Sequence, residues 1–257
     1  MNVDGREATG VTLSTGEVVP ADLVVANVHP RILVDLLPEG AVRPAYRHRV
    51  RDAQLGVGHL GVYLELDVPA RGIGNANVYR LASWDLGGEM PLTRPGEVPL
   101  YYAGAPGEHG PEGRHHHHTV LMVLPLDWAL VAPWADTREE DRPAAYRELK
   151  QALLDSAVEA LLADFPELRG HVVRAEASTP LSTAKYVRSP QGAMYGHYHS
   201  VAQMGRYRPA QGTRVRNLVL VGQGVGFPGI LGVTLSAYHA AGYVVGRETL
   251  IEELRGA

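Results

Sequence analysis

A short apolar run that passes into a glycine-rich turn, near the C-terminus, constrains the fold more than any other feature of the sequence. Residues 217–221 have the composition of a buried strand, and four glycines follow within residues 222–229. Residues from about 230 to 246 then carry the small and apolar side chains of a packed helix. A helix that begins in this way presents free backbone N–H groups and the positive end of its dipole, and both favour an anionic group.

The segment from Gly224 to Gly229 matches the spacing GxGxxG, but its context differs from that of a dinucleotide-binding fingerprint. The fingerprint opens a βαβ unit and is followed about 20 residues later by an acidic residue on the next strand. Here Glu248 has nearly that spacing but falls in a predicted helix. Two interpretations of the local pattern therefore stay open: a ligand-binding turn, or a turn that only packs the helix against its strand.

The two ends of the chain both read as parts of one sheet. Residues 8–19 predict a hairpin, with its turn around Gly16. Residues 23–26 are continuously apolar, which predicts a strand buried on both faces. A short helix is expected over residues 31–37, before Pro38.

The middle of the chain has a different pattern. Candidate strands follow one another at short intervals, which favours an antiparallel sheet. They cover residues 61–68, 76–82, 98–103, 118–126 and 172–177, and residues 104–113 are expected to be a loop. One long helix is predicted from Arg142 to Phe165, with Asp141 as its N-cap and an apolar stripe that includes Leu153 and Leu161.

Composition excludes several classes of function. With 24 Lys and Arg against 28 Asp and Glu, the net charge of −4 lacks the basic surface of a general nucleic-acid binder. The absence of cysteine excludes disulfides, thiolate zinc sites and a cysteine nucleophile. The sequence has no signal peptide and no apolar stretch long enough to span a membrane, so we expect a soluble, cytoplasmic protein with at most peripheral membrane contact.

Two histidine-rich segments are candidate sites. The four residues His115–His118 are predicted to be a solvated loop leading into a strand and not a metal site, because neighbours on a strand alternate faces. For residues 197–199 we favour a polar loop with satisfied hydrogen bonds over a cofactor contact. The nearby tyrosines are expected either to line an aromatic channel or to pack the loop; they are Tyr186, Tyr195, Tyr198 and Tyr207.

Four segments together resemble the phytoene dehydrogenase-like flavoproteins, which include carotenoid desaturases, carotenoid isomerases and retinol saturases. One of them, residues 112–120, resembles the loop and strand that the family places mid-domain. Residues 222–237, with the core Pro-Gly-Ile-Leu-Gly-Val, are similar to the C-terminal flavin motif of the isomerase and saturase branch. Residues 10–27 resemble the hairpin and strand that precede the substrate domain, and residues 179–196 resemble the approach to the flavin. Members of that family are about twice as long, so the resemblance covers their C-terminal half only.

The resemblance implies FAD as cofactor and an apolar, carotenoid-like isoprenoid as substrate. It implies desaturation, saturation or isomerisation by hydride transfer with the flavin, which needs no protein nucleophile. No catalytic residue is assigned. The residues that it places against FAD are Gly222, Gln223, Gly229, Ile230, Leu231, Gly232 and Val233. The alternative is a non-catalytic binding or interaction module from a truncated or split flavoprotein gene.

We therefore predict a mixed α/β fold in two parts. Residues 1–37 and 206–257 are expected to form an incomplete, Rossmann-like FAD/NAD(P)-binding region, and residues 38–205 a substrate-binding region with a largely antiparallel sheet. The expected partners are an apolar small molecule and either a separate N-terminal flavin-binding subunit or a second copy of the chain. No nucleic acid is expected.

Overall fold

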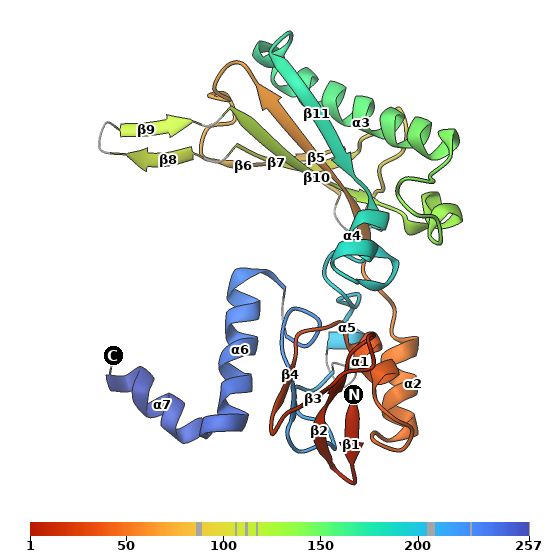
Figure 1. Ribbon diagram of the computed structural model, residues 1–257. Coiled ribbons are helices and arrows are strands. Elements are labelled where there is room, and N and C mark those ends of the chain that lie inside the picture. The colour runs from red at the N-terminus through yellow and green to blue at the C-terminus, as the bar shows by residue number, and fades with distance from the viewer. Residues whose placement is uncertain are drawn as a thin grey trace. The chain divides into compact units, whose positions relative to one another are not determined.

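The computed structural model describes residues 1–85, 89–105, 107–110, 113–116, 118–204, 209–226 and 228–256. It confirms a mixed α/β architecture with a largely antiparallel sheet (Figure 1). The chain forms two compact units. The first unit contains Met1–Gly56 and Tyr195–Ala257, and the second contains Val57–Met194. Their assignment to a cofactor and to a substrate stays a prediction.

The first unit combines an antiparallel meander with a parallel strand pair. The meander consists of β1 (Asn2–Asp4), β2 (Glu7–Thr12) and β3 (Val18–Pro20), and the parallel pair of β4 (Val24–Ala26) and β12 (Leu218–Leu220). The helices of this unit are α1 (Pro30–Leu36), α2 (Pro44–Asp52), α5 (Val201–Met204), α6 (Gly229–Val245) and α7 (Arg247–Gly256). Leu218 lies opposite Val24 and Leu220 opposite Ala26, so both strands end at the same edge.

The core of the first unit lies under the parallel pair, where Leu33, Leu37, Leu218 and Leu220 are buried. The prediction that residues 23–26 are buried on both faces is wrong, because the side chain of Val25 is 56% exposed. Ala26 faces the core and is buried, whereas Val25 points to the opposite side of the strand.

The second unit is built on an antiparallel sheet in the order β11-β5-β10-β7-β6. These strands are β5 (Gly58–Leu66), β6 (Asn77–Leu81), β7 (Leu100–Gly104), β10 (Thr119–Leu126) and β11 (Val172–Ser178). Helix α3 (Ala144–Asp164) packs across one face of this sheet (Figure 1). Shorter helical elements complete the unit: α4 (Pro180–Tyr186) and the 3-10 turns Trp128–Leu130, Ala132–Trp134, Pro166–Leu168 and Pro190–Gly192.

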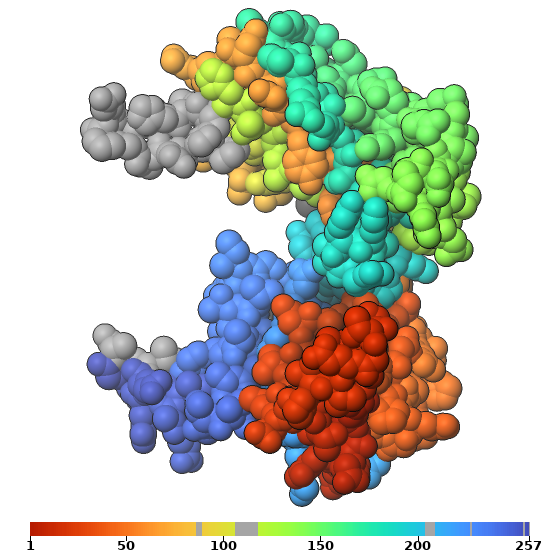
Figure 2. Space-filling model, in the orientation of Figure 1, coloured from red at the N-terminus to blue at the C-terminus, as the bar shows by residue number. Residues whose placement is uncertain are grey.

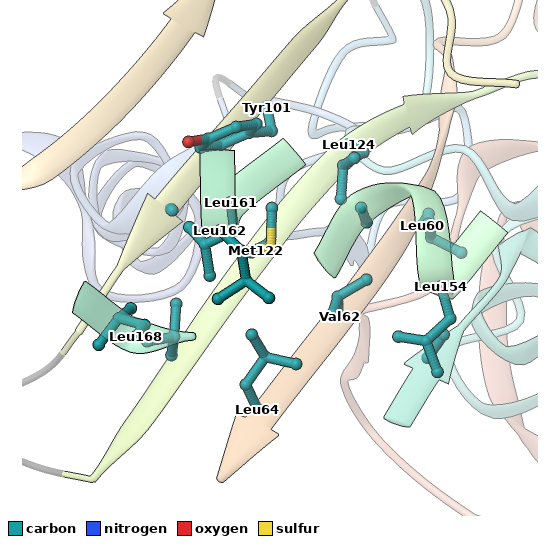
Figure 3. Close-up of a cluster of buried hydrophobic side chains, with 14 of the residues drawn as sticks. Leu60, Val62, Leu64, Tyr101, Met122, Leu124, Leu154, Leu161, Leu162 and Leu168 are labelled. Carbon is teal, nitrogen blue, oxygen red and sulfur yellow. The ribbon is translucent and has the colours of Figure 1, made fainter. Parts of the chain in front are cut away.

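Alternation along the strands explains how the second unit packs. Leu60, Val62 and Leu64 of β5 point to the same face, and every second residue of β10 does likewise. In Figure 3 these side chains meet Leu161 and other leucines of α3 in a closed apolar cluster. The residues between them, such as Tyr63, therefore point to the opposite face of the sheet.

Two local predictions for this unit are wrong. The N-cap of α3 is Pro143 and not Asp141, and no side chain caps the helix. The loops expected over residues 104–113 and at His115–His118 overlap a hairpin of β8 (Gly107–Gly110) and β9 (Gly113–His116). Its two strands consist of Gly, Glu, His and Arg only, so they lack the apolar alternation by which a strand is normally identified.

Candidate functional site

Three loops of the first unit meet at the carboxyl ends of β4 and β12. One loop follows β4 and includes Asn27 and His29; the second follows β12; the third contains Gly196. A Cβ at Gly222 would overlap the side-chain oxygen of Asn27, and a Cβ at Gly196 would lie 3.6 Å from the Cα of Gly224. In open α/β sheets, ligands bind beyond the carboxyl ends of the parallel strands. This edge is therefore the candidate site.

The turn after β12 is closed by its own backbone. Val221 N–H donates to the carbonyl of Ala26 at 3.0 Å, and the N–H groups of Val225 and Gly226 both donate to the carbonyl of Gly222 at 3.3 Å. Gly222 has φ +96°, a conformation that residues with a Cβ rarely adopt. Close packing of backbone and glycine thus fixes the path of the chain from β12 to α6.

Helix α6 begins at this turn without a side-chain cap. Its N-cap is Pro228, and no acidic residue lies in its first turn. The side chains of Ile230 and Leu231 are 89% and 73% exposed, although both are large and apolar. Atoms of α6, in lighter blue, lie at the surface of the first unit in Figure 2. An open helix start with exposed apolar side chains can accept a ligand that is anionic in one part and apolar in another.

The residues predicted to contact FAD all lie in this turn and at the start of α6. Gly222 and Gln223 are half-buried in the turn, and Gly232 is buried next to Gly226. The open positions are Gly229, where a Cβ would meet nothing within 4 Å, and the neighbouring Ile230 and Leu231. Val233 is half-buried. The contact of these seven residues with a cofactor stays a prediction.

A histidine pair at the same edge, in which His197 is buried and His29 half-buried, was not predicted. His29 is the N-cap of α1, and its Nδ1 accepts the backbone N–H of Arg31 at 3.2 Å. The ring of His197, which is 9% exposed, lies 4.8 Å from that of His29, measured between centroids. Within the described part of the chain, His29 Nε2 has no hydrogen-bond partner, whereas the ring of His197 interacts with the backbone of Val50 and Gly224.

The environment of the pair opposes a positive charge on either ring. Burial, then His197 and then Arg31 lower the pKa of His29 to about 3. Burial and then Arg31 lower the pKa of His197, and they outweigh the opposite effect of its hydrogen bonds to the backbone of Val50 and Gly224. Both rings are therefore neutral at neutral pH. The local sequence gave no sign of this pairing, because the two residues are far apart along the chain and each sits in a short polar loop.

The second unit presents a separate candidate surface on the face of its sheet opposite α3. Tyr63 and Leu121 lie opposite each other on β5 and β10, and both are exposed. Tyr79 and Tyr102 stack at 5.3 Å between ring centroids. Depressions of about 320 and 380 Å³ flank Leu121, one lined also by Tyr63 and one by Tyr102. This face can hold an elongated apolar molecule.

The tyrosines expected either to line an aromatic channel or to pack the loop belong to different units of the chain. Tyr186 is exposed and its hydroxyl donates to Glu139 in the second unit. Tyr195 and Tyr198 are exposed in the first unit, and Tyr207 lies outside the described residues.

The described residues contain neither a group that could hold a metal ion nor a helix that could span a membrane. Among them there is no group of three or more His, Asp or Glu side chains arranged to hold a metal ion. His117 and the side chains of His115 and His116 lie outside this description. No helix in the described part of the chain is both long and apolar enough to cross a membrane.

Substitution of Gly222 tests the packing of the turn. We expect Gly222→Ala to lower the free energy of unfolding by about 2 kcal/mol, since it adds an overlap with Asn27 to the cost of a positive φ. Gly16→Ala is the matched control, because Gly16 also has a positive φ but no atom near its Cβ position. It should cost about 1 kcal/mol. Equal losses in urea unfolding would contradict the packing argument.

No protein-family model matches the sequence. The chain is similar to all-trans-retinol 13,14-reductases. It is 23% identical to that of Danio rerio over 276 residues, covering 97% of this chain and 44% of the relative. It is 24% identical to that of Homo sapiens over 267 residues, covering 94% of this chain and 43% of the relative. The chain therefore spans less than half the length of these curated relatives.

Among solved structures, an oxidoreductase from Methanosarcina mazei has a similar fold. Its TM-score to this chain is 0.52 at 17% sequence identity, and the match covers 93% of this chain and 47% of that one. This likeness concerns the fold alone.

Proposed function

We propose that this chain is the C-terminal part of an FAD-dependent oxidoreductase that desaturates, saturates or isomerises an apolar isoprenoid. The observation that carries the proposal is the glycine turn at the carboxyl ends of β4 and β12, which leads into the uncapped start of α6. The similarity to retinol reductases over 94% and 97% of the chain supports the same reaction class and an isoprenoid substrate. A phytoene dehydrogenase-like or carotenoid specificity is the finer form of this proposal.

The start of α6 fits the cofactor in charge and in space. Its free N–H groups and positive dipole end suit the anionic parts of FAD, and no acidic side chain in its first turn opposes them. At Gly229 nothing lies within 4 Å of the Cβ position, so a ligand can approach the backbone there. Residues 222–223 and 229–233 would hold the cofactor. When bound, FAD supplies the hydride acceptor or donor for all three reactions.

The open face of the second unit's sheet suits the proposed substrate. A polyene offers only apolar and π contacts, and the faces of Tyr63 and Tyr102 together with Leu121 offer the same. Glu65, Arg174 and Glu176 form a polar border of the depression beside Tyr63. The role of this chain in the reaction is then to bind and orient the substrate and to exclude water, and no side chain needs to act as a nucleophile.

We further propose that a separate N-terminal flavin-binding subunit completes the cofactor site. A parallel sheet is normally covered on both faces and has more than two strands. Here β4 pairs with β12, while Leu23 and Val25 are exposed. The chain also spans less than half of the length of the retinol reductases. A second copy of this chain is the other candidate for the same surface.

A non-catalytic binding module is the second candidate function. The tight packing at Gly222, Gly224 and Gly226 favours it, because these glycines are required by the fold even without a ligand. The two candidates differ in one measurement. An oxidoreductase half binds flavin, alone or after addition of the flavin-binding half, and turns over a polyene, whereas a binding module retains at most the polyene.

A charge placed at the start of α6 tests the cofactor site. We expect Ile230→Glu to weaken FAD binding by about tenfold or more, because a carboxylate there competes with the anionic cofactor. The fold should be unaffected, since Ile230 is exposed and an acidic residue suits the first turn of a helix. The measurement is a titration followed by flavin fluorescence, with the flavin-binding half added where the chain alone does not retain FAD.

Ile230→Gln is the matched control for that titration, because it removes the same apolar side chain without adding charge. It should retain most of the affinity. Equal affinity of the glutamate variant and the unsubstituted chain would contradict the placement of FAD at α6.

A further inference from the structure

The histidine pair lies where the three loops of the candidate site touch. A Cβ at Gly196 would lie 3.6 Å from His29 Nε2 and 3.6 Å from the Cα of Gly224. A Cβ at Gly224 would lie 2.8 Å from the ring of Pro30. The rings of His29 and His197 therefore occupy the junction between the start of α1, residues 195–199 and the glycine turn.

Backbone hydrogen bonds fix the loop on both sides of His197. Gly56 N–H donates to the carbonyl of Gly196 at 2.8 Å, and Tyr198 N–H donates to the carbonyl of Gln54 at 2.8 Å. The side chain of Gln203 donates to the carbonyls of Gln54 and Tyr198. With its neighbours held in this way, His197 is directed inward toward His29.

The protonation state of His29 follows from its hydrogen bond. Its Nδ1 accepts an N–H from Arg31, so in the neutral ring the proton lies on Nε2. A second proton would have to go on Nδ1, where it would face that N–H. Protonation would therefore break the N-cap of α1 as well as place a charge in the junction.

The titratable groups that face the two rings are basic. Arg31 acts on both rings, His199 acts on His197, and each ring acts on the other. The carboxylates of Asp35 and Asp52 face Arg31, whose guanidinium also donates to the carbonyl of Ala53. A proton on either ring thus meets repulsion from these groups and no balancing carboxylate among them. On His197 the backbone of Val50 and Gly224 favours the proton, but burial and Arg31 have the larger effect.

We propose that the His29–His197 pair is a latch that positions the glycine turn, and that protonation opens it. The two neutral rings hold residues 195–199 and 222–226 against the start of α1. A positive charge on either ring separates them and frees the turn. The proposal rests on the proposed function only in naming this turn as the cofactor turn, and it makes affinity for FAD fall in acid.

The sign of the effect follows from linkage. A histidine that is free in the open state takes up its proton near pH 6.5, whereas His29 in the closed state does so near pH 3. Between these values the open state binds more protons, so a fall in pH favours opening. Each such histidine can raise the ratio of open to closed forms by up to about tenfold per pH unit.

Amide hydrogen exchange on the chain between pH 7 and pH 4.5 tests the latch. The reporters are the amides of Gly56, Tyr198, Val225 and Gly226, which are hydrogen-bonded at the junction. We expect their protection factors, corrected for the intrinsic rate at each pH, to fall by about tenfold or more. The amide of Val24, which donates to Asn217 and lies away from the rings, should change much less.

Two variants test the contribution of each ring to the pH dependence. His29→Asn keeps an N-cap acceptor and His197→Leu keeps a buried side chain, but neither can be protonated. Either variant should reduce the pH dependence of the four protection factors, and the double variant should abolish it. His48→Gln, in α2 and exposed, should leave it unchanged. If a variant fails to fold, the pH series on the unsubstituted chain still decides.

FAD titrations at the same pH values separate this proposal from the proposed function. An acid-induced loss of protection at the junction supports the latch, even where FAD does not bind at any pH and the proposed function fails. The latch is overturned if protection falls equally at Val24 and at the four reporters, or if it does not fall at any of them. FAD affinity that is constant with pH while the junction loses protection overturns the link between latch and cofactor.

Discussion

Asn217→Ala is expected to lower the free energy of unfolding of the first unit by about 3 kcal/mol. The side chain of Asn217 makes three hydrogen bonds that join separate parts of the sheet. Its Oδ1 accepts Ala8 N–H at 2.7 Å, and its Nδ2 donates to the carbonyls of Ala8 at 2.7 Å and Asp22 at 2.8 Å. The substitution leaves the buried backbone of Ala8 without partners, which is the costly case.

The same substitution should loosen the candidate site, because Asn217 directly precedes β12 and the glycine turn follows it. Urea unfolding followed by circular dichroism, which reports both units, measures the loss. Arg216→Ala is the neighbouring control. Arg216 forms an exposed ion pair with Glu7, so its removal should cost less than about 1 kcal/mol. Equal costs for Asn217 and Arg216 would refute the role assigned to the carboxamide.

The sequence predicts those elements well whose signal is periodic and clearly ended. The helix expected over residues 142–165 is α3 at Ala144–Asp164, and the one expected from about 230 to 246 is α6 at Gly229–Val245. In both cases the apolar repeat is longer than three turns. Proline or glycine also marks an end, Pro166 after α3 and Gly246 after α6.

Contacts between distant segments are what the sequence does not predict. Asn217 reads as the first residue of a strand, and nothing local shows that its carboxamide joins Ala8 and Asp22. His29 and His197 are likewise paired only by the fold. The glycine turn was predictable as a turn, yet its tight fit against Asn27 and Pro30 depends on a strand almost two hundred residues earlier. The geometry of the candidate site thus depends on contacts between residues that are far apart in the sequence.

Exposure of apolar residues is a second feature that the sequence obscures. Residues 23–26 read as core, but Val25 is exposed, and the large apolar side chains of Ile230 and Leu231 at the start of α6 are exposed as well. Hydrophobic periodicity indicates which side chains are favourable to bury. It does not say whether the surface that covers them belongs to the same chain. This is the same observation that supports the proposal of a separate flavin-binding subunit.

The segment before Met194 carries backbone strain that no propensity rule indicates. Arg188 and Gln191 have φ of +58° and +54°, in the left-handed region that favours glycine, and Gly192 follows with +62°. A Cβ at Gly192 would overlap the carbonyl of Pro180 and would lie 2.6 Å from its Cα. Strained residues of this kind often mark functional segments. The resemblance to the family's approach to the flavin covers these same residues.

Gly192→Ala should therefore lower the free energy of unfolding, and Gln191→Gly should raise it. The first adds a Cβ where backbone stands and should cost about 3 kcal/mol or more. The second relieves a left-handed residue whose side chain is exposed, and should stabilise the fold by up to about 1 kcal/mol. Urea unfolding followed by tryptophan fluorescence measures both, because Trp84, Trp128 and Trp134 all lie in the second unit.

If the strain is only a consequence of folding, Gln191→Gly should raise stability and leave flavin and substrate binding unchanged. If the strain serves substrate binding by the second unit, the more stable variant should bind substrate less well, since a relaxed backbone no longer holds residues 188–194 in place. Gly170→Ala is the control for positive φ without overlap, because nothing lies within 4 Å of its Cβ position. A loss at Gly192 no larger than that at Gly170 would show that Pro180 does not constrain this segment.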